Sequence, residues 1–123
     1  MPKIVALHHA ALTVPTDGLE EARRFYSGLL GLREATRPEA ELGRPGIWYS
    51  LGATELHIQC RDGGPQEDSD YHPALIVDDV AGLRAHLDSS GIATIDAPTL
   101  MGRERFFCRD PFGNRIEFMS LPG

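Results

Sequence analysis

Hydrophobic and polar residues alternate along this chain in short runs, and the spacing of the alternation changes from run to run. Residues 9–14 and 72–77 alternate with a period of two, which is typical of β-strands with one buried face. Residues 19–32 and 80–92 follow these runs with apolar residues at i, i+3 and i+4, which predicts two amphipathic helices. A strand followed by a helix therefore occurs twice.

Polar residues and glycines mark the ends of both predicted helices. Asp17 and Glu20 have the spacing of an N-terminal capping box for the first helix. Asp78 or Asp79 can cap the second helix. A glycine stands after each helix, where a left-handed C-terminal cap is expected: Gly31 and Gly91.

Three further strand-like runs follow each helix, so the chain contains a β-α-β-β-β unit twice. These runs are residues 32–37, 46–51 and 54–60 in the first repeat, and 92–97, 104–110 and 114–120 in the second. The repeats span residues 1–61 and 70–121, and residues 61–70 form a polar linker between them. We expect one α+β domain over residues 1–123, made of these two repeats.

The alternation also predicts which side chains share the sheet face opposite the helices. His9 and His72 occupy equivalent positions in the first strand of each repeat, and His57 and Glu117 lie in the last strands. We therefore expect these four side chains to converge on one concave face. His8 should leave the opposite face of its strand, and we expect no chemical role for it.

Composition excludes several classes of function. The 123 residues are 41% hydrophobic and 24% charged, as in ordinary soluble proteins, and no apolar run is long enough to cross a bilayer. The net charge of −6 argues against nucleic acid as the main partner. Two cysteines are too few for a disulfide framework, and the N-terminus lacks a signal-peptide pattern. We expect a cytoplasmic protein with reduced thiols, in which Cys108 is a small buried hydrophobe.

The paired units resemble the vicinal oxygen chelate superfamily, as do the stretches HHAALTVP at residues 8–15 and RFFCRDPFGNRIEF at residues 105–118. This superfamily includes glyoxalase I, fosfomycin-resistance thiol transferases, extradiol dioxygenases and bleomycin-binding proteins. The resemblance covers nearly the whole chain, and DPFGNRIE at residues 110–117 is its most specific part. It implies a glyoxalase-like fold, in which two βαβββ modules form a curved eight-stranded mixed sheet.

The resemblance also implies a divalent metal held by His9, His72 and Glu117, with His57 as a candidate fourth ligand. Two imidazoles and one carboxylate suit Fe(II), Mn(II), Zn(II) or Ni(II). The metal would chelate two adjacent oxygens of a small substrate in a lyase, isomerase, thiol transferase or dioxygenase reaction. Glu117 would double as the catalytic base if it left the metal, as a glyoxalase-type isomerisation requires. Small members of the superfamily commonly pair. We therefore expect a homodimer whose interfacial sites take His9 and His57 from one chain and His72 and Glu117 from the other.

This chain departs from several branches of the superfamily. Resemblance to glyoxalase I would favour a glutamate on the fourth strand, where this chain has His57, and Glu55 lies two residues away. The potassium-binding loop of the fosfomycin-resistance enzymes is not recognisable, and the chain is too short for the usual two-domain dioxygenases. The reaction class and the substrate therefore stay open.

Each candidate residue also has a purely structural interpretation. His9 and His72 can be histidines whose rings are satisfied by backbone carbonyls. Trp48 and Phe107 either pack in the core or line the substrate cavity. Arg103 is a candidate contact for an anionic substrate, as is its neighbour Arg105, although solvated arginines at a strand edge are common. If no metal is bound, the alternative is a bleomycin-resistance-like protein that sequesters a drug or metabolite in the same cavity.

Overall fold

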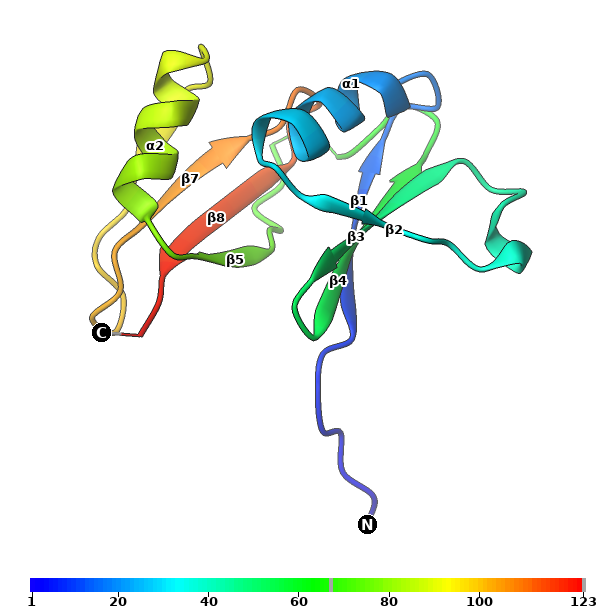
Figure 1. The fold of residues 1–123 in the computed structure, drawn as a ribbon, viewed down its shortest axis with the longest axis horizontal. Coiled ribbons are helices and arrows are strands. Elements are labelled where there is room, and N and C mark those ends of the chain that lie inside the picture. The colour runs from blue at the N-terminus through cyan, green and yellow to red at the C-terminus, as the bar shows by residue number, and fades with distance from the viewer. Residues whose placement is uncertain (67, 123) are drawn as a thin grey trace. The chain divides into compact units, whose positions relative to one another are not determined.

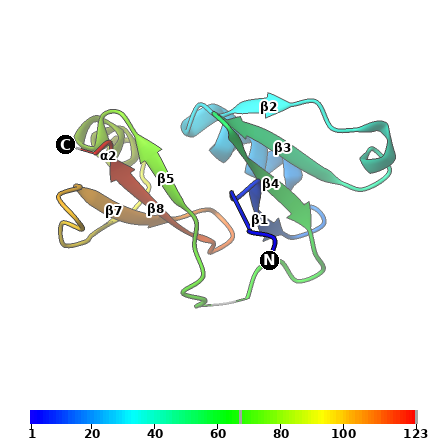
Figure 2. The same ribbon diagram turned by 90° about the horizontal axis from the view of Figure 1, so that it is seen from below.

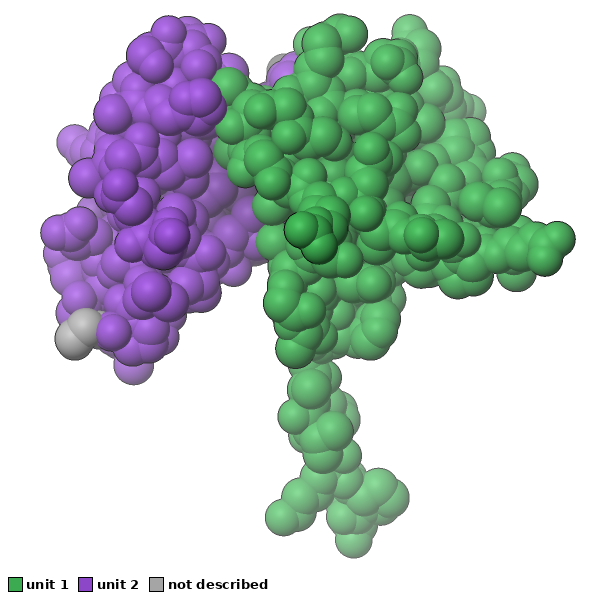
Figure 3. Space-filling model, viewed as in Figure 1, with its two compact units in different colours: residues 1–65 green, residues 66–123 purple. Residues whose placement is uncertain are grey.

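The computed structural model describes residues 1–66 and 68–122, so residue 67 of the predicted linker lies outside the described residues. The chain divides into two compact units, residues 1–65 and residues 66–123 (Figure 3), and each is described by itself. Both units contain the elements β-α-β-β-β in that order. The predicted α+β class and the two βαβββ modules are therefore confirmed.

Unit 1 is a four-stranded mixed sheet with a helix on one face (Figures 1 and 2). The strand order is β1-β4-β3-β2, with β1 parallel to β4 and the other pairs antiparallel. A π-helical stretch at Arg24–Leu29 continues α1, and a 3-10 turn at Glu39–Glu41 follows β2. The elements are β1 (His9–Val14), α1 (Leu19–Arg23), β2 (Arg33–Ala35), β3 (Gly46–Leu51) and β4 (Thr54–Cys60).

Unit 2 repeats this topology with the strand order β5-β8-β7-β6, in which β5 is parallel to β8. Its elements are β5 (Ala74–Val77), α2 (Val80–Ser89), β6 (Thr94–Asp96), β7 (Arg105–Arg109) and β8 (Arg115–Ser120). In the described residues the strands thus form two four-stranded sheets, where the resemblance implied one sheet of eight strands. The physical reason is that the first and last strands of each repeat pair with each other and complete a sheet within the unit.

The core of each unit lies between its helix and the adjacent sheet face. Alternate residues of the strands supply this face, as the period of two predicts. The buried strand residues on the helix side are Leu12, Val14, Ile47, Tyr49, Leu56, Ile58, Phe106, Cys108, Ile116 and Phe118. The intervening residues, among them the candidate ligands, therefore share the opposite face of each sheet.

The helix ends correct one prediction and confirm three. Asp17 does not cap α1, whose N-cap is Gly18 without a side-chain hydrogen bond, because residues 15–18 form a tight turn in which the Gly18 N–H donates to the Pro15 carbonyl. The Asp79 side chain does cap α2, accepting from the Gly82 N–H at 2.9 Å. The two predicted C-terminal glycines have the expected positive φ, +71° at Gly31 and +82° at Gly91.

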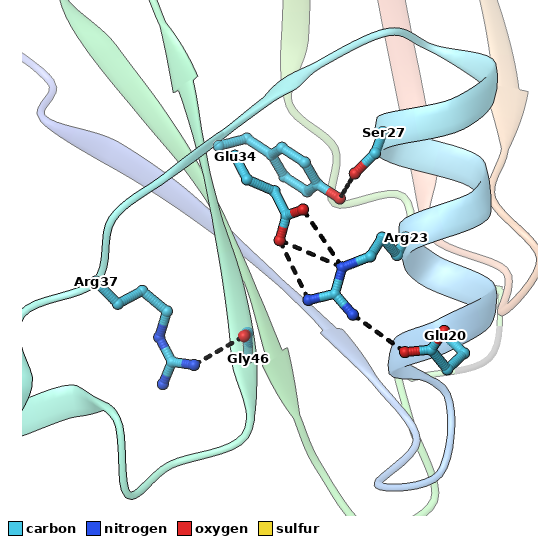
Figure 4. A network of polar contacts seen from close by, with 7 residues as sticks. Glu20, Arg23, Ser27, Glu34, Arg37 and Gly46 are labelled. Carbon is cyan, nitrogen blue, oxygen red and sulfur yellow. Dashed lines mark hydrogen bonds and ion pairs between the residues drawn. The ribbon is translucent and has the colours of Figure 1, made fainter.

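Polar contacts tie α1 to the sheet of unit 1 (Figure 4). The Arg23 guanidinium donates to the Glu34 carboxylate at 3.1 Å, and the Ser27 and Tyr49 hydroxyls are 2.7 Å apart. These contacts fix β2 and β3 against the helix. In the same region Arg37 donates to the Gly46 carbonyl at 2.8 Å and so closes the loop between β2 and β3.

Candidate metal centre

The structure brings His72 and Glu117 together in unit 2. Parallel pairing sets Ala74 opposite Glu117, and the Glu117 N–H donates to the Pro73 carbonyl at 3.0 Å. The residues just before β5 therefore lie beside the middle of β8. His72 Nε2 is 3.0 Å from Glu117 Oε1, and the Glu117 side chain is only 6% exposed.

Both ring nitrogens of His72 have partners, and these partners define its protonation. Nδ1 is 2.8 Å from the Asp70 carbonyl oxygen, which can only accept, so Nδ1 carries a proton. A neutral ring then has its lone pair on Nε2, facing a carboxylate oxygen. Two such acceptors at 3.0 Å need a positive charge between them, either a proton or a metal ion. A ring N–H held by a carbonyl is also the usual support of a histidine metal ligand.

Arg105 supports the second oxygen of the same carboxylate. Its Nη1 lies 3.5 Å from Glu117 Oε2, and its Nε donates to the Pro98 carbonyl at 2.7 Å. From the sequence, Arg103 is the first candidate for a substrate contact and Arg105 the second. In the structure Arg103 lies before β7, in a β-bridge with Leu100. The alternation of β7 was the signal for Arg105, since it puts this residue on the same face as Phe107.

Phe107 forms the wall of the cluster in unit 2. The antiparallel register sets it opposite Glu117, and its ring meets that of His72 edge to face with centroids 5.2 Å apart. The Arg115 guanidinium lies 4.0 Å from the Phe107 centroid, and that of Arg105 lies 5.6 Å away. We call His72, Arg105, Phe107, Arg115 and Glu117 the unit 2 cluster.

The corresponding face of unit 1 carries a stack of three rings. His57 lies between Trp48, at 4.0 Å and 3° between planes, and His9, at 4.1 Å and 14°. The strand register explains the stack, because Trp48 is opposite His57 and His9 is opposite Glu55. We call His9, Trp48, Glu55 and His57 the unit 1 cluster.

His57 is buried within this stack, and its nitrogen is already engaged. Its Nε2 lies 2.9 Å from Glu55 Oε1, and this hydrogen bond lowers the pKa of the Glu55 carboxyl. Imidazole binds metals through lone pairs in the plane of the ring. Because the His9 and His57 rings are nearly parallel and face to face, their lone pairs run side by side and do not converge on one ion in this conformation.

His8 differs from its prediction. We expected it to leave the opposite face of the strand from His9, but the two Nδ1 atoms are 2.9 Å apart. The reason is that β1 begins at His9, so the alternation of a strand does not extend to His8. One ring therefore donates to the other. When His9 is the donor, its Nε2 keeps the lone pair, as in His72.

No group of three or more His, Cys, Asp or Glu side chains in residues 1–66 and 68–122 is arranged to hold a metal ion. The candidate ligands lie in both units: His72 and Glu117 are neighbours in unit 2, and His9 and His57 stack in unit 1.

Other features of the described chain carry less chemistry. A cavity of about 260 Å³ lies between α2 and strands β6 and β7, with Arg84, Asp96 and Glu104 among its walls. His72 and Glu117 do not line it. Burial raises the pKa of Cys108 to about 12, so this thiol is not an activated nucleophile.

Comparison with known proteins assigns the family. The family model described as Glyoxalase/Bleomycin resistance protein/Dioxygenase superfamily matches residues 6–118. The chain therefore belongs to this superfamily, as its motifs predicted. No curated protein matches it.

Solved structures agree with this assignment. A glyoxalase family protein from Bacillus anthracis is 34% identical with a TM-score of 0.89, and 98% of each chain is covered. A glyoxalase/dioxygenase from Nostoc punctiforme is 20% identical with a TM-score of 0.74, over 100% of this chain and 99% of that one. A lactoylglutathione lyase from Agrobacterium tumefaciens is 18% identical with a TM-score of 0.71, over 97% and 96%. The last two likenesses show the fold alone.

Among the described residues, no helix has the length and apolar character to cross a membrane.

Proposed function

We propose that this chain is a small divalent-metal-dependent enzyme of the glyoxalase/dioxygenase superfamily, with His72, Glu117 and His9 as the ligands. The observation that carries the proposal is the His72–Glu117 pair, in which Nε2 and Oε1 face each other at 3.0 Å and need a positive charge between them. Membership of the superfamily supports it, as does the equivalence of His9 and His72 in the repeat.

The residues of unit 2 fit such a group. A bound Fe(II), Mn(II), Zn(II) or Ni(II) ion would supply Lewis-acid stabilisation of charge on two adjacent substrate oxygens. The Asp70 carbonyl accepts from the Nδ1–H of His72, so Nε2 is the ring nitrogen that would bind the ion. Arg105 holds Glu117 Oε2, so Oε1 is the carboxylate atom that faces His72 and would hold the ion, or accept a proton once it has left the ion.

The proposal covers several reaction classes and does not select the reaction of any single relative. Lyase, isomerase, thiol transferase and dioxygenase chemistry all use a substrate with vicinal oxygens, and the ligand set suits each of them. The proposal therefore specifies metal-assisted chemistry on a small substrate and does not specify which bond is broken. A location in the cytoplasm also stays a prediction from the sequence.

Metal analysis of the full chain tests the proposal directly. Tag-free protein is stripped with a chelator, desalted, and titrated with Mn(II), Zn(II), Ni(II) or Fe(II). We expect one ion per chain, and we expect His72→Ala and Glu117→Gln to abolish its uptake. His86→Ala, in the last turn of α2, is the matched control and should bind as the parent does. Uptake that survives both substitutions in unit 2, or no uptake at all, contradicts the proposal.

We further propose that the protein is a homodimer whose sites take His9 from one chain and His72 and Glu117 from the other. Light scattering measures the mass. Mixing His9→Ala protein with Glu117→Gln protein distinguishes shared sites from sites within one chain. A mixed dimer with shared sites contains one intact set of ligands and recovers part of the metal, whereas sites within one chain recover none.

A second candidate function has its own observation. The Trp48–His57–His9 stack is a flat aromatic surface, which suits a metal-free protein that sequesters a planar drug or metabolite. This candidate predicts ligand binding that chelators do not change, together with absence of turnover. Binding of an aromatic ligand that is lost with Trp48→Ala and unchanged by metal removal would favour it over the enzyme.

A further inference from the structure

Arginines gather on the metal-ligand face of unit 2, although the chain as a whole is acidic. It has 12 Lys and Arg against 18 Asp and Glu. Strand alternation nevertheless puts the three arginines of β7 and β8 on the face that carries Glu117, and the antiparallel register sets Arg109 directly opposite Arg115. The three are Arg105, Arg109 and Arg115.

One of the three has a structural task. Arg109 donates to the Gly113 carbonyl at 2.8 Å and to the Ser69 carbonyl at 3.4 Å. These bonds close the hairpin between β7 and β8 and tie the preceding segment to it. Arg109 is therefore part of the scaffold.

Arg105 and Arg115 are placed differently, since both guanidinium groups lie over the ring of Phe107. Their side chains are 17% and 28% exposed, so they are partly desolvated yet still reachable. A guanidinium carries five N–H donors, and the contacts described for Arg115 engage one of them, at 3.3 Å from Asp70 Oδ1. Donors thus remain for a ligand.

The balance of charge on this face is positive. Two guanidinium groups face one buried carboxylate, that of Glu117. The Asp70 carboxylate that meets Arg115 is 91% exposed, so water screens this pair and weakens it. A partly buried positive site is best satisfied by a bound anion, and planar guanidinium groups match carboxylate and phosphonate oxygens in particular.

We infer that the substrate of this protein is a small anion whose carboxylate or phosphonate group is bound by Arg105 and Arg115. The inference names the substrate class for the site under Proposed function and rests on that function for the chemistry that follows binding. Recognition of the anion itself needs only the two arginines and the Phe107 wall, so it is measurable without metal.

Three probes of similar size separate charge from shape. Pyruvate is a carboxylate with two adjacent oxygenated carbons, acetylphosphonate carries the phosphonate instead, and methyl pyruvate is a neutral ester with the same dicarbonyl. Each is titrated into metal-stripped protein from which the chelator has been removed by desalting, and again after loading with Mn(II) or Zn(II). Backbone and arginine Nε resonances in ¹H–¹⁵N NMR spectra report binding and its location.

We expect at least one of the two anions to bind about tenfold or more tightly than methyl pyruvate, with shifts at Arg105 and Arg115. Arg115→Gln should remove this preference, and Arg115→Lys should keep part of it, because the charge remains while the planar fork is lost. Asp70→Asn should strengthen binding, since it removes the competing carboxylate. Arg84→Gln, on α2, is the matched control and should change nothing.

Two results would overturn the inference. One is equal binding of the neutral ester and the anions, or no binding of either anion. The other is an equal loss of anion binding in Arg84→Gln and Arg115→Gln. The titration of metal-stripped protein distinguishes failure of this inference from failure of the proposed function. Anion binding to the stripped protein supports the inference even when the chain takes up no metal.

Discussion

The two units place different chemistry on the same backbone positions. In each, a histidine stands before or at the start of the first strand, and its sheet neighbours come from the last two strands. In unit 1 these neighbours are His57 and Trp48, which are paired across β4 and β3; in unit 2 they are Glu117 and Phe107, paired across β8 and β7. One exchange, histidine for glutamate, accompanies the change from a ring stack to a charged pair.

The difference shows how a duplicated scaffold can divide its tasks. A ring at position 57 stacks on both neighbours and turns its Nε2 to Glu55, so unit 1 offers an aromatic surface. A carboxylate at position 117 cannot stack, and it instead gathers the His72 ring and the Arg105 guanidinium around itself. Unit 2 is therefore where we propose the metal ligands and the anion-binding arginines.

The largest expected effect comes from matched amide substitutions at these two equivalent positions. Glu117→Gln should weaken metal binding more than the roughly 10- to 100-fold that outer-shell partners contribute, because it removes a ligand oxygen charge. His57→Gln should cost less than about tenfold, as expected of a residue outside the ligand set. Competition titrations with a chelating dye measure both affinities. An equal loss in the two variants would make His57 a ligand and remove the contrast between the units.

The next effect concerns stability, for which we expect His57 of unit 1 to matter more than His72 of unit 2. His57 is 4% exposed and packed between two rings, so His57→Ala should destabilise the fold by about 2–3 kcal/mol, near the lower end for a buried ring. His57→Phe keeps the stack and should cost about 1 kcal/mol or less. Urea unfolding followed by circular dichroism measures both.

His72→Ala serves as the reference for this stability prediction. Its side chain is 28% exposed, and its loss should cost less than that of His57. A His57→Phe protein as unstable as His57→Ala would show that the Glu55 hydrogen bond, and not the ring stack, holds the unit 1 cluster together.

These comparisons also show which parts of the molecule the sequence predicts. The period of two and the repeat correctly predict the element order of both units and the shared face of His72 and Glu117. The element order is a local property, since it follows from the period of each run, whereas the shared face also needs the parallel pairing of the first and last strands.

Other features depend on details that periodicity does not contain. The His8–His9 contact arises because the strand begins at His9, so its alternation does not extend to His8. The cap of α1 moves because a turn occupies residues 15–18. The orientation of the His57 ring depends on Trp48, which lies nine positions earlier and becomes a neighbour only through sheet register. Ring orientation is a property of packing, and composition does not determine it.

The third effect compares the cysteines of the two units. Burial raises the pKa of Cys108 from 9.0 to about 12, so above pH 9 the native state keeps a proton that the unfolded state releases. The stability that this proton contributes is present below pH 9 and is lost as the pH rises from about 9 to about 12, by at most about 1.4 kcal/mol per pH unit. Unfolding in urea with reductant at pH 8, 9 and 10 should show a shallower decline for Cys108→Ala than for Cys60→Ala. Equal slopes in the two variants would contradict the assignment of this pH dependence to Cys108 of unit 2.

The smallest expected effect tests the hydrogen bond that turns His57 away from a ligand role. The bond from His57 lowers the pKa of Glu55 below 4.5, so the native carboxylate stays ionised where the unfolded one takes up a proton. Its contribution to stability is therefore present above pH 4.5 and is lost as the pH falls through the lower native pKa. Glu55→Gln should flatten this acid dependence slightly, since water screens the side chain, while Glu104→Gln should leave it unchanged. Unfolding free energies measured from pH 6 down to pH 3 report the difference. If Glu55→Gln also raised metal affinity, the released Nε2 of His57 would have joined the ligands, and the contrast in metal binding between the two units would depend on this bond.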